Sequence, residues 1–351
     1  MVLLKVNPVQ PEPDVIRQAA EVIRRGGLVA FPTETVYGLG ADAMNAEAVA
    51  RIFVVKGRPA SDPLIVHIAN GKDLERVARE WPPQARVLSD SFWPGPLTLV
   101  LPRAEALPPS VTAGLDTVAV RMPAHPVALA LIRAARTPIA APSANLFGHV
   151  SPTTAQHVLD DLGERVDLIL DGGPAFIGLE STVLDLSGEQ PAILRPGGIS
   201  HEALSRVLGP VAVRAHDHQP RRNRSGIPSP GLLEKHYAPR ARLIFFRGEE
   251  QKVLVAMVKQ LDQLLAQRKR VGVLVASEDK TVFAGYPVIV EDLGPRDDLN
   301  LVATRLFGAV RTLDEQGVDV ILARGFGTAG LGLAIEDRLT KAAGGQVVEV
   351  S

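Results

Sequence analysis

One stretch, residues 28–68, limits what this chain can fold into more than any other. It reads LVAFPTETVYGLGADAMNAEAVARIFVVKGRPASDPLIVHI. An apolar run ends at Pro32, a loop rich in hydroxyls and glycine follows, and a helical segment at 46–55 leads to Lys56-Gly-Arg58 before a second apolar run at 63–68. This order predicts a βαβ-scale unit whose polar groups lie at turns, where binding residues are usually found. The stretch therefore predicts an anion site.

Hydrophobic periodicity extends the alternation of strands and helices along the chain. Strands are predicted at 28–31, 63–68, 97–101, 117–122, 139–141, 167–170 and 181–185, and helices at 14–25, 46–55, 74–79, 126–135 and 153–162. A second, smaller set has strands at 242–246, 270–276 and 318–323 and helices at 253–268, 299–316 and 333–343. The fold class expected is α/β, with a mixed sheet in the first part and a smaller Rossmann-like α/β domain at the C-terminal end.

Length and composition agree with this division. A chain of 351 residues exceeds the usual size of a single core, and 46% hydrophobic residues supply material for two. The boundaries predicted are 1–215, a connecting segment at 216–240, and 241–351. A net charge of -1 gives no overall basic field for nucleic acid or membrane, so any anion site must be local.

The absence of cysteine removes thiol nucleophiles, thiolate metal sites and disulfides. The N-terminal apolar run stops at Lys5, too early for a signal peptide, and no apolar run is long enough for a membrane helix. A cytoplasmic protein with no membrane contact is expected.

The connecting segment has its own composition. Residues 216–239 read HDHQPRRNRSGIPSPGLLEKHYAP, and the window 214–242 holds seven Lys or Arg against two acids. Two interpretations stay open: a solvated tether, or a basic segment that folds over an anionic ligand. Under the second, 229–239 is a lid that orders on ligand binding, with His236 and Tyr237 as its contacting residues.

The C-terminal part contains GFGTAG at 325–330, a literal G-x-G-x-x-G between a strand and a helix, with Glu349 about twenty residues on. A dinucleotide fingerprint normally opens the first strand–helix turn, whereas this one follows the last predicted strand with no chain left to complete a sheet. A closely packed glycine-rich turn, or one that meets the other domain, is therefore favoured over a dinucleotide site.

Five motifs in order give a more specific signal. They are PTETVYGLG at 32–40, KGRP with PLIVHI at 56–68, APSAN at 141–145, GLESTV at 178–183 and ILRPGGI at 193–199. Together they resemble the YrdC-like family of threonylcarbamoyl-AMP synthases, and the SPG and HYAP motifs near 229–239 are similar to its two-domain version.

The resemblance implies a reaction and its partners. L-threonine, bicarbonate or CO2, and ATP would form threonylcarbamoyl-adenylate and pyrophosphate, with Mg²⁺ carried by ATP and no separate protein metal site. The product would serve a downstream tRNA threonylcarbamoyl-transfer machinery, and a tRNA contact is a further expectation. Such a site needs several cations, hydroxyls and backbone donors, more than a covalent nucleophile.

The resemblance also implies roles for particular residues. Lys56 and Arg58 would be catalytic and would face the carbamate and the ATP phosphates. The threonine contacts implied are Thr35, His67, Arg121, Ala141 and Ser181. The further nucleotide contacts implied are Asp62, Thr117, Ser143, Asn145, Ser151, Arg195 and Tyr237. Asp62 stands where the family often has an amide, and Glu234 where some members have a tyrosine.

Each pattern also has a plainer interpretation from the residues alone. Lys56-Gly-Arg58 is expected to form a rigid, non-helical turn that can direct both cations at one anion, and the plainer alternative is a solvated turn. His67 could be a satisfied core histidine, and Arg121 a salt bridge at the end of a strand. Two other classes of function stay open as well: a nucleic-acid-binding module, disfavoured by 4% aromatic residues, and a dinucleotide oxidoreductase based on 325–330.

Overall fold

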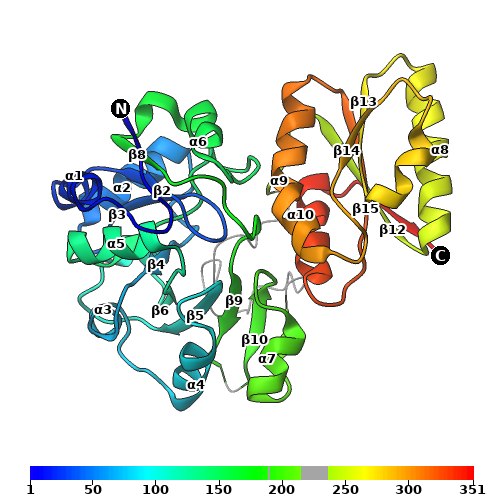
Figure 1. Cartoon of the computed structure of the whole chain (residues 1–351). Helices are drawn as coiled ribbons and strands as arrows, with labels where there is room; N and C mark the ends of the chain where they lie inside the picture. The colour runs from blue at the N-terminus through cyan, green and yellow to red at the C-terminus, as the bar shows by residue number, and fades with distance from the viewer. Residues whose placement is uncertain (189, 215–235) are drawn as a thin grey trace. The chain divides into compact units, whose positions relative to one another are not determined.

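The computed structural model describes residues 1–188, 190–214 and 236–351, which divide into two compact units. The first unit comprises residues 1–147 and 151–176 and the described residues of 180–214. The second comprises 236–351 together with two short segments, Gly148–Val150 and Ile177–Leu179. Figure 1 draws the chain from blue at the N-terminus to red at the C-terminus.

The first unit contains most of the secondary structure. Its helices are α1 (Pro13–Arg24), α2 (Ala46–Lys56), α3 (Gly71–Val77), α4 (Pro83–Phe92), α5 (Pro126–Ala135), α6 (Ala155–Leu162) and α7 (His201–Leu208), with 3-10 turns η1 (Pro109–Thr112) and η2 (Gly163–Arg165). Its strands are β1 (Val2–Lys5), β2 (Val29–Phe31), β3 (Gly38–Asp42), β4 (Ile65–His67), β5 (Leu97–Pro102), β6 (Thr117–Arg121), β7 (Ile139–Ala140), β8 (Leu168–Asp171), β9 (Thr182–Asp185), β10 (Ala192–Arg195) and β11 (Ala212–Val213).

These strands form one mixed sheet in the order β1-β8-β2-β3-β7-β4-β6-β5-β9-β10-β11. Successive side chains of a strand point to opposite faces, so each face acquires its own core. Val29 and Phe31 pack with α1 and α5 on one face, whereas Leu28 and Ala30 belong to a second cluster that includes residues of α2 and α6. The strand ends that carry the polar motifs therefore lie between two helical layers.

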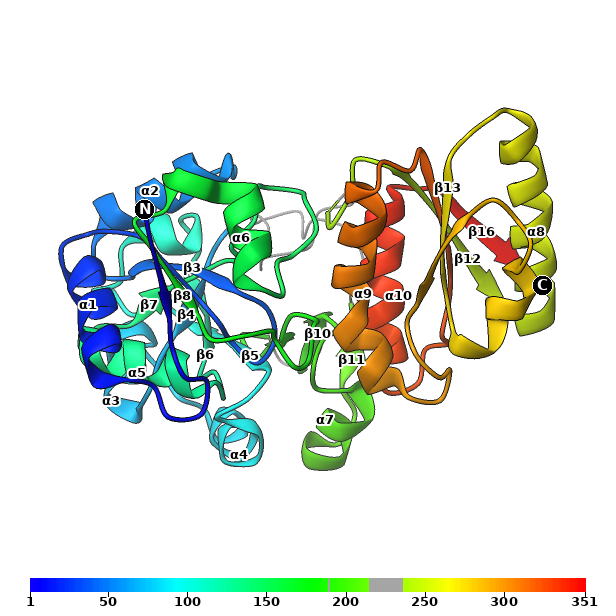
Figure 2. The same ribbon diagram turned by 45° about the horizontal axis from the view of Figure 1, so that its top comes forward.

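The second unit is built on a smaller sheet. Its elements are β12 (Arg242–Gly248), α8 (Glu250–Ala266), β13 (Val271–Val275), η3 (Ser277–Phe283), β14 (Ile289–Asp292), α9 (Leu299–Glu315), β15 (Val320–Arg324), α10 (Gly332–Ala343) and β16 (Val347–Val350). The strands run in the order β14-β13-β15-β12-β16, and each neighbouring pair is parallel. Figure 2 shows α8 on one face of this sheet and α9 with α10 on the other.

The predicted α/β fold class, a mixed sheet followed by a smaller α/β unit, is confirmed. Helix α5 has the bounds predicted. Pro126 is its first residue, and His125 Nδ1 caps it by accepting from the Val127 amide at 3.2 Å. The glycine-rich segment 38–42, expected to be loop, is strand β3. The predicted rigid non-helical Lys56-Gly-Arg58 turn is wrong in part, since Lys56 is the last residue of α2 and Gly57 ends that helix at φ 64°.

The glycine-rich turn at 325–330 follows β15, the fourth strand of its unit, and precedes α10. The expectation that this turn follows the last strand is wrong, because β16 comes after it and pairs with β12. A Cβ at Gly325 would lie 3.2 Å from Glu336 Oε1 and 3.3 Å from Arg247 Cβ, so the turn is closely packed here. The strand order β14-β13-β15-β12-β16 also differs from the order in a dinucleotide-binding sheet. In such a sheet the glycine turn follows the first strand, whereas here it follows the fourth.

Candidate active site

Two neighbouring strand ends bring His67 and Arg121 together. Strands β4 and β6 are parallel, and their register places His67 opposite Arg121, the last residue of each strand. Each residue is only 4% exposed. A strand end is where a side chain can be both held by a sheet and turned toward a ligand. This edge of the sheet is the starting point of the site.

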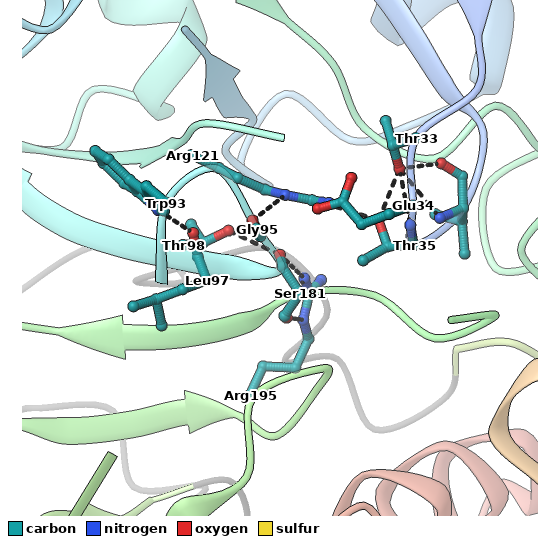
Figure 3. Close-up of polar contacts among 11 residues, drawn as sticks. Thr33, Glu34, Thr35, Trp93, Gly95, Leu97, Thr98, Arg121, Ser181 and Arg195 are labelled. Carbon is teal, nitrogen blue, oxygen red and sulfur yellow. Dashed lines mark hydrogen bonds and ion pairs between the residues drawn. The ribbon is translucent and has the colours of Figure 1, made fainter. Parts of the chain in front are cut away.

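Arg121 is bound by three groups from two loops. Its Nη1 donates to Thr35 Oγ1 at 2.9 Å, its Nη2 lies 2.6 Å from Glu34 Oε1, and its Nε donates to the Gly95 carbonyl at 3.3 Å. The Thr35 hydroxyl is also 2.8 Å from that of Thr33 (Figure 3). The planar guanidinium thus fixes the Thr33–Thr35 loop beside the strand ends.

Ser181 joins the same region from the next strands. Its Oγ lies 2.7 Å from Thr98 Oγ1, and Thr98 is the register partner of Arg121 between β5 and β6. Arg195 Nη2 donates to the Ser181 carbonyl at 2.9 Å and to its Oγ at 3.2 Å (Figure 3). We call Thr35, His67, Arg121 and Ser181 the strand-end cluster.

Burial makes His67 neutral. Loss of solvent, aided by the nearby Arg121 charge, lowers the pKa of His67 to about 3. Its ring meets Phe31 edge to face, with centroids 6.2 Å apart, and its Nδ1 is buried with no hydrogen-bond partner among the described residues. Backbone groups of Ile65 and Ile139 also act on the ring, so both a core histidine and a histidine that offers one ring nitrogen to a ligand fit this geometry.

A second group of polar residues surrounds the end of α2. Lys56, 2% exposed, donates through Nζ to the Ser143 carbonyl at 2.6 Å and to the carbonyl of Asn145. The Phe147 amide donates to the Lys56 carbonyl at 2.9 Å. Burial, and then the neighbouring Arg58, hold the pKa of Lys56 well below its usual value. We call Lys56, Arg58, Ser143 and Asn145 the turn cluster.

Arg58 is paired with Asp62. Its Nη2 lies 2.9 Å from Asp62 Oδ1 and donates to the Pro63 carbonyl at 2.7 Å. Burial raises the pKa of Asp62, an effect opposed by the charges of Arg58, Lys56 and Arg195. Arg195 therefore lies near enough to act on the turn cluster while its guanidinium binds Ser181.

Two other predicted residues occupy the margins of these clusters. Ser151 Oγ donates to Glu180 Oε1 at 2.5 Å, one residue before Ser181. Thr117 begins β6 four residues before Arg121, about 13 Å away along an extended strand. Pro63, whose carbonyl accepts from Arg58, lies two residues before β4, the parallel neighbour of β6.

The turn at 141–145 connects the clusters. The Ala141 amide donates to the Ile65 carbonyl at 2.9 Å, and Ser143 forms an isolated β-bridge with Gly38. From this turn, Ala141 lies against β4 of the strand-end cluster and Ser143 accepts from Lys56. The structure thus gathers most of the predicted residues of the first unit in or beside two adjoining clusters, and Thr117 lies at the far end of β6 from Arg121.

Tyr237 belongs to the second unit, and its predicted nucleotide contact stays a prediction. It is 2% exposed, with its ring stacked on Phe307 at a centroid distance of 5.6 Å. The predicted connecting segment and lid lie largely outside the described residues, as does Glu234. The interpretations of the connecting segment as a tether or as a lid therefore stay predictions.

Two residues of this region, Glu34 and Thr98, were not predicted as functional from the sequence. Glu34, fully buried, supplies the carboxylate beside Arg121, and its place between Thr33 and Thr35 was the available signal. Thr98 holds Ser181, but a threonine in an apolar strand gives no functional signal by itself.

Neither a metal cage nor a membrane span is found in the described chain. In residues 1–188, 190–214 and 236–351 no three His, Asp or Glu side chains gather so that they could hold a metal ion. Over the same ranges, no helix combines the length and apolar character needed to cross a bilayer.

Comparison with known proteins places this arrangement in a family. Residues 21–197 match a family model for Sua5, YciO and YrdC described as telomere recombination, and residues 199–344 match one described as threonylcarbamoyl-AMP synthase, C-terminal domain. A threonylcarbamoyl-AMP synthase of Pyrococcus abyssi is 46% identical over 338 residues, covering 95% of this chain and 96% of that protein. The Bacillus subtilis enzyme of the same name is 49% identical over 336 residues, covering 95% and 94%.

A solved structure extends the agreement to the fold. The crystal structure of P. abyssi Sua5 complexed with L-threonine matches with a TM-score of 0.93 and 46% identity, over 100% of both chains. The resemblance drawn from the five sequence motifs is therefore confirmed. This chain belongs to the two-domain Sua5 family of threonylcarbamoyl-AMP synthases.

Proposed function

We propose that this chain is an L-threonylcarbamoyladenylate synthase, which condenses L-threonine, bicarbonate or CO2, and ATP to threonylcarbamoyl-AMP and pyrophosphate. The observation that carries the proposal is the strand-end cluster, where a neutral His67 with an unpaired Nδ1 lies opposite Arg121 and the hydroxyls of Thr35 and Ser181 are close by. A cation for a carboxylate, with neutral hydrogen-bonding groups beside it, is complementary to a hydroxy amino acid.

The threonine contacts we propose are Thr35, His67, Arg121, Ala141 and Ser181. The guanidinium of Arg121 would bind the carboxylate, and its pairing with Glu34 keeps it oriented before the substrate arrives. The L-threonine complex of the P. abyssi relative supports the choice of amino acid.

The turn cluster suits the nucleotide. Lys56 and Arg58 would face the carbamate and the phosphates, with Arg195 at the triphosphate tail and Asp62, Thr117, Ser143, Asn145, Ser151 and Tyr237 as further nucleotide contacts. A carbamate oxygen attacks the α-phosphorus while the bond to the pyrophosphate oxygen breaks, so negative charge shifts onto the leaving group. Such a step depends on alignment and charge neutralisation, which these buried cations supply without a covalent intermediate on the protein.

Magnesium and the later steps belong to the same proposal. Mg²⁺ prefers oxygen ligands and is usually held by substrate phosphates with one or two carboxylates. It would neutralise phosphate charge when bound with ATP. We also propose that the adenylate passes in the cytoplasm to the machinery that makes threonylcarbamoyladenosine in tRNA.

Pyrophosphate release tests this proposal. With ATP, Mg²⁺ and bicarbonate, each of the twenty amino acids is supplied in turn, and release is expected with L-threonine well above the others. Release that is equal for all amino acids, or absent with threonine, would contradict the proposed function.

A further inference from the structure

One face of α9 in the second unit is occupied by three separate chain segments. Thr304, Phe307 and Arg311 are spaced i, i+3 and i+7, so they lie along one side of this helix. Each contacts a segment outside the sheet that α9 covers. The structure therefore gives this helix face a role besides packing on its own sheet.

Arg311 holds the first segment, Gly148–Val150. Its Nη2 donates to the Val150 carbonyl at 2.5 Å, and the Arg311 side chain is only 8% exposed. At the other end of the segment, the Gly148 carbonyl accepts from the Ala238 amide at 2.8 Å. A buried arginine directed at a main-chain carbonyl fixes backbone position more than it contributes surface charge.

Thr304 meets the second segment, Ile177–Leu179. Gly178 has φ +78°, and a Cβ there would lie 2.5 Å from Thr304 Cα and 2.6 Å from the Ala303 carbonyl oxygen. Thr304 Oγ1 also reaches the Ile177 carbonyl at 3.5 Å. Only glycine permits so close an approach of backbone to helix.

Phe307 supports the third segment through Tyr237. The tyrosine has φ 61°, a conformation that non-glycine residues adopt at a cost, and it persists where the surroundings fix it. Here its ring stacks on Phe307, with the Arg338 guanidinium 5.1 Å from the ring centroid.

Chain connectivity links the first two segments to the candidate active site. Asn145 and Ser151 flank the segment held by Arg311, and Glu180 and Ser181 directly follow the segment held by Thr304. Ser151 and Glu180 are hydrogen bonded to each other. Asn145, Ser151, Glu180 and Ser181 are thus each within three residues of a segment that contacts this face of α9.

We propose that the Thr304–Phe307–Arg311 face of α9 sets the geometry of the two loops at 145–151 and 177–181, and that Arg311 is a positioning residue of the synthase. The inference rests on the proposed function, and it gives the C-terminal unit a task in that reaction. Displacement of a substrate-holding group by about 1 Å can lower a rate roughly a hundredfold, so a contact remote from the chemistry can still control it.

The test compares Arg311→Ala with Arg311→Lys and with Arg305→Ala. Arg305 is an exposed arginine of the same helix whose Nη1 donates to the Asp292 carbonyl at 3.3 Å, so its removal is a matched control. The readouts are kcat and KM for ATP and threonine by pyrophosphate release, and hydrogen exchange by mass spectrometry over peptides 144–153 and 175–182.

Arg311→Ala is expected to lower kcat at least about tenfold and to speed exchange in peptide 144–153, while peptides from α8 and β13 exchange as before. Arg311→Lys, which can still donate to the Val150 carbonyl, should recover much of the loss, and Arg305→Ala should match the wild type. Wild-type kinetics in Arg311→Ala overturn the proposal, whether or not its exchange changes.

A second variant covers the case in which Arg311→Ala does not fold. Gly178→Ala should speed exchange in peptide 175–182 and lower kcat, because the added Cβ forces the loop away from Thr304; unchanged kinetics in this folded variant also overturn the proposal. If the wild type itself releases no pyrophosphate, the proposed function fails, and unchanged exchange in Arg311→Ala would then contradict the holding of the loop independently.

Discussion

The strand-end cluster and the turn cluster hold their cations in different ways. Arg121 is fixed by the side chains of Glu34 and Thr35 and by one main-chain carbonyl, whereas Lys56 is fixed chiefly by main-chain carbonyls of the 143–145 turn. Loss of the first leaves an opposite charge buried without its partner. Loss of the second leaves carbonyl oxygens without a donor and loosens a turn. Substitutions in the two clusters should therefore have different kinetic signatures.

Arg121→Ala should give the largest effect. Removing one partner of a buried ion pair costs about 3 kcal/mol or more, and here it also removes the proposed carboxylate contact, so kcat/KM for threonine should fall about a hundredfold or more while KM for ATP changes little. Steady-state pyrophosphate release with each substrate varied measures this. The double variant Glu34→Gln with Arg121→Ala should recover thermal stability but not threonine use. An unchanged KM and rate for threonine in Arg121→Ala would contradict the proposal that Arg121 binds the threonine carboxylate.

Lys56→Ala should come next. Its kcat should be lowered about tenfold or more, whichever of the two substrates is varied. Lys56→Arg should not restore it, because a planar guanidinium does not fit where a compact ammonium meets the Ser143 and Asn145 carbonyls. Single-turnover pyrophosphate release with saturating ATP is the measurement. Full activity in Lys56→Arg would show that charge alone matters at this position.

The hydroxyl pair of Thr98 and Ser181 should give a smaller effect. Ser181→Ala is expected to raise KM for threonine by about tenfold, and Thr98→Val by less, since Thr98 acts through Ser181. The double variant should cost less than the sum of the two single changes. Strict additivity of the two changes would mean that the hydroxyls act separately.

The pH response of His67 concerns stability and not catalysis. Its pKa is lowered to about 3 in the folded chain from an ordinary value of 6.5, so the unfolded state binds the proton more tightly between these values. The free energy of unfolding should therefore fall as the pH falls from 6.5 toward 3, by at most about 1.4 kcal/mol per pH unit for this one group. Urea unfolding from pH 7 to 4 should show a flatter dependence in His67→Gln than in the wild type. Identical pH slopes would mean that His67 titrates normally.

Local patterns in the sequence were enough to predict most elements. The helix at 126–135 and the strands around 65–67 and 117–121 follow from apolar periodicity and from proline at a helix start. The elements missed are the strands β1, β3, β10, β11, β14 and β16 and the helices α4 and α7. Among them, β3 and β16 are a glycine-rich segment and a short terminal segment, which become strands only when a neighbour pairs with them. Pairing is a tertiary effect that local propensity does not carry.

Some features of the candidate site could likewise be predicted from local sequence, and others could not. The five motifs predicted which residues matter, but the meeting of His67 with Arg121 depends on the β4–β6 register, which no local pattern gives. The buried carboxylate of Glu34 and the hydroxyl of Thr98 likewise gain their meaning only from what lies opposite them. The role of Arg311 is further from reach, since it depends on short loop segments packing on a helix far along the chain.

The most direct measurement follows the bicarbonate carbon. The chain is supplied with ATP, Mg²⁺, L-threonine and carbon-labelled bicarbonate, and the adenylate is isolated and compared with the pyrophosphate released. The account predicts one labelled carbon in each adenylate, with one pyrophosphate for each adenylate formed, and loss of both products in Arg121→Ala. An unlabelled threonyl adenylate, or pyrophosphate release that does not depend on bicarbonate, would contradict it.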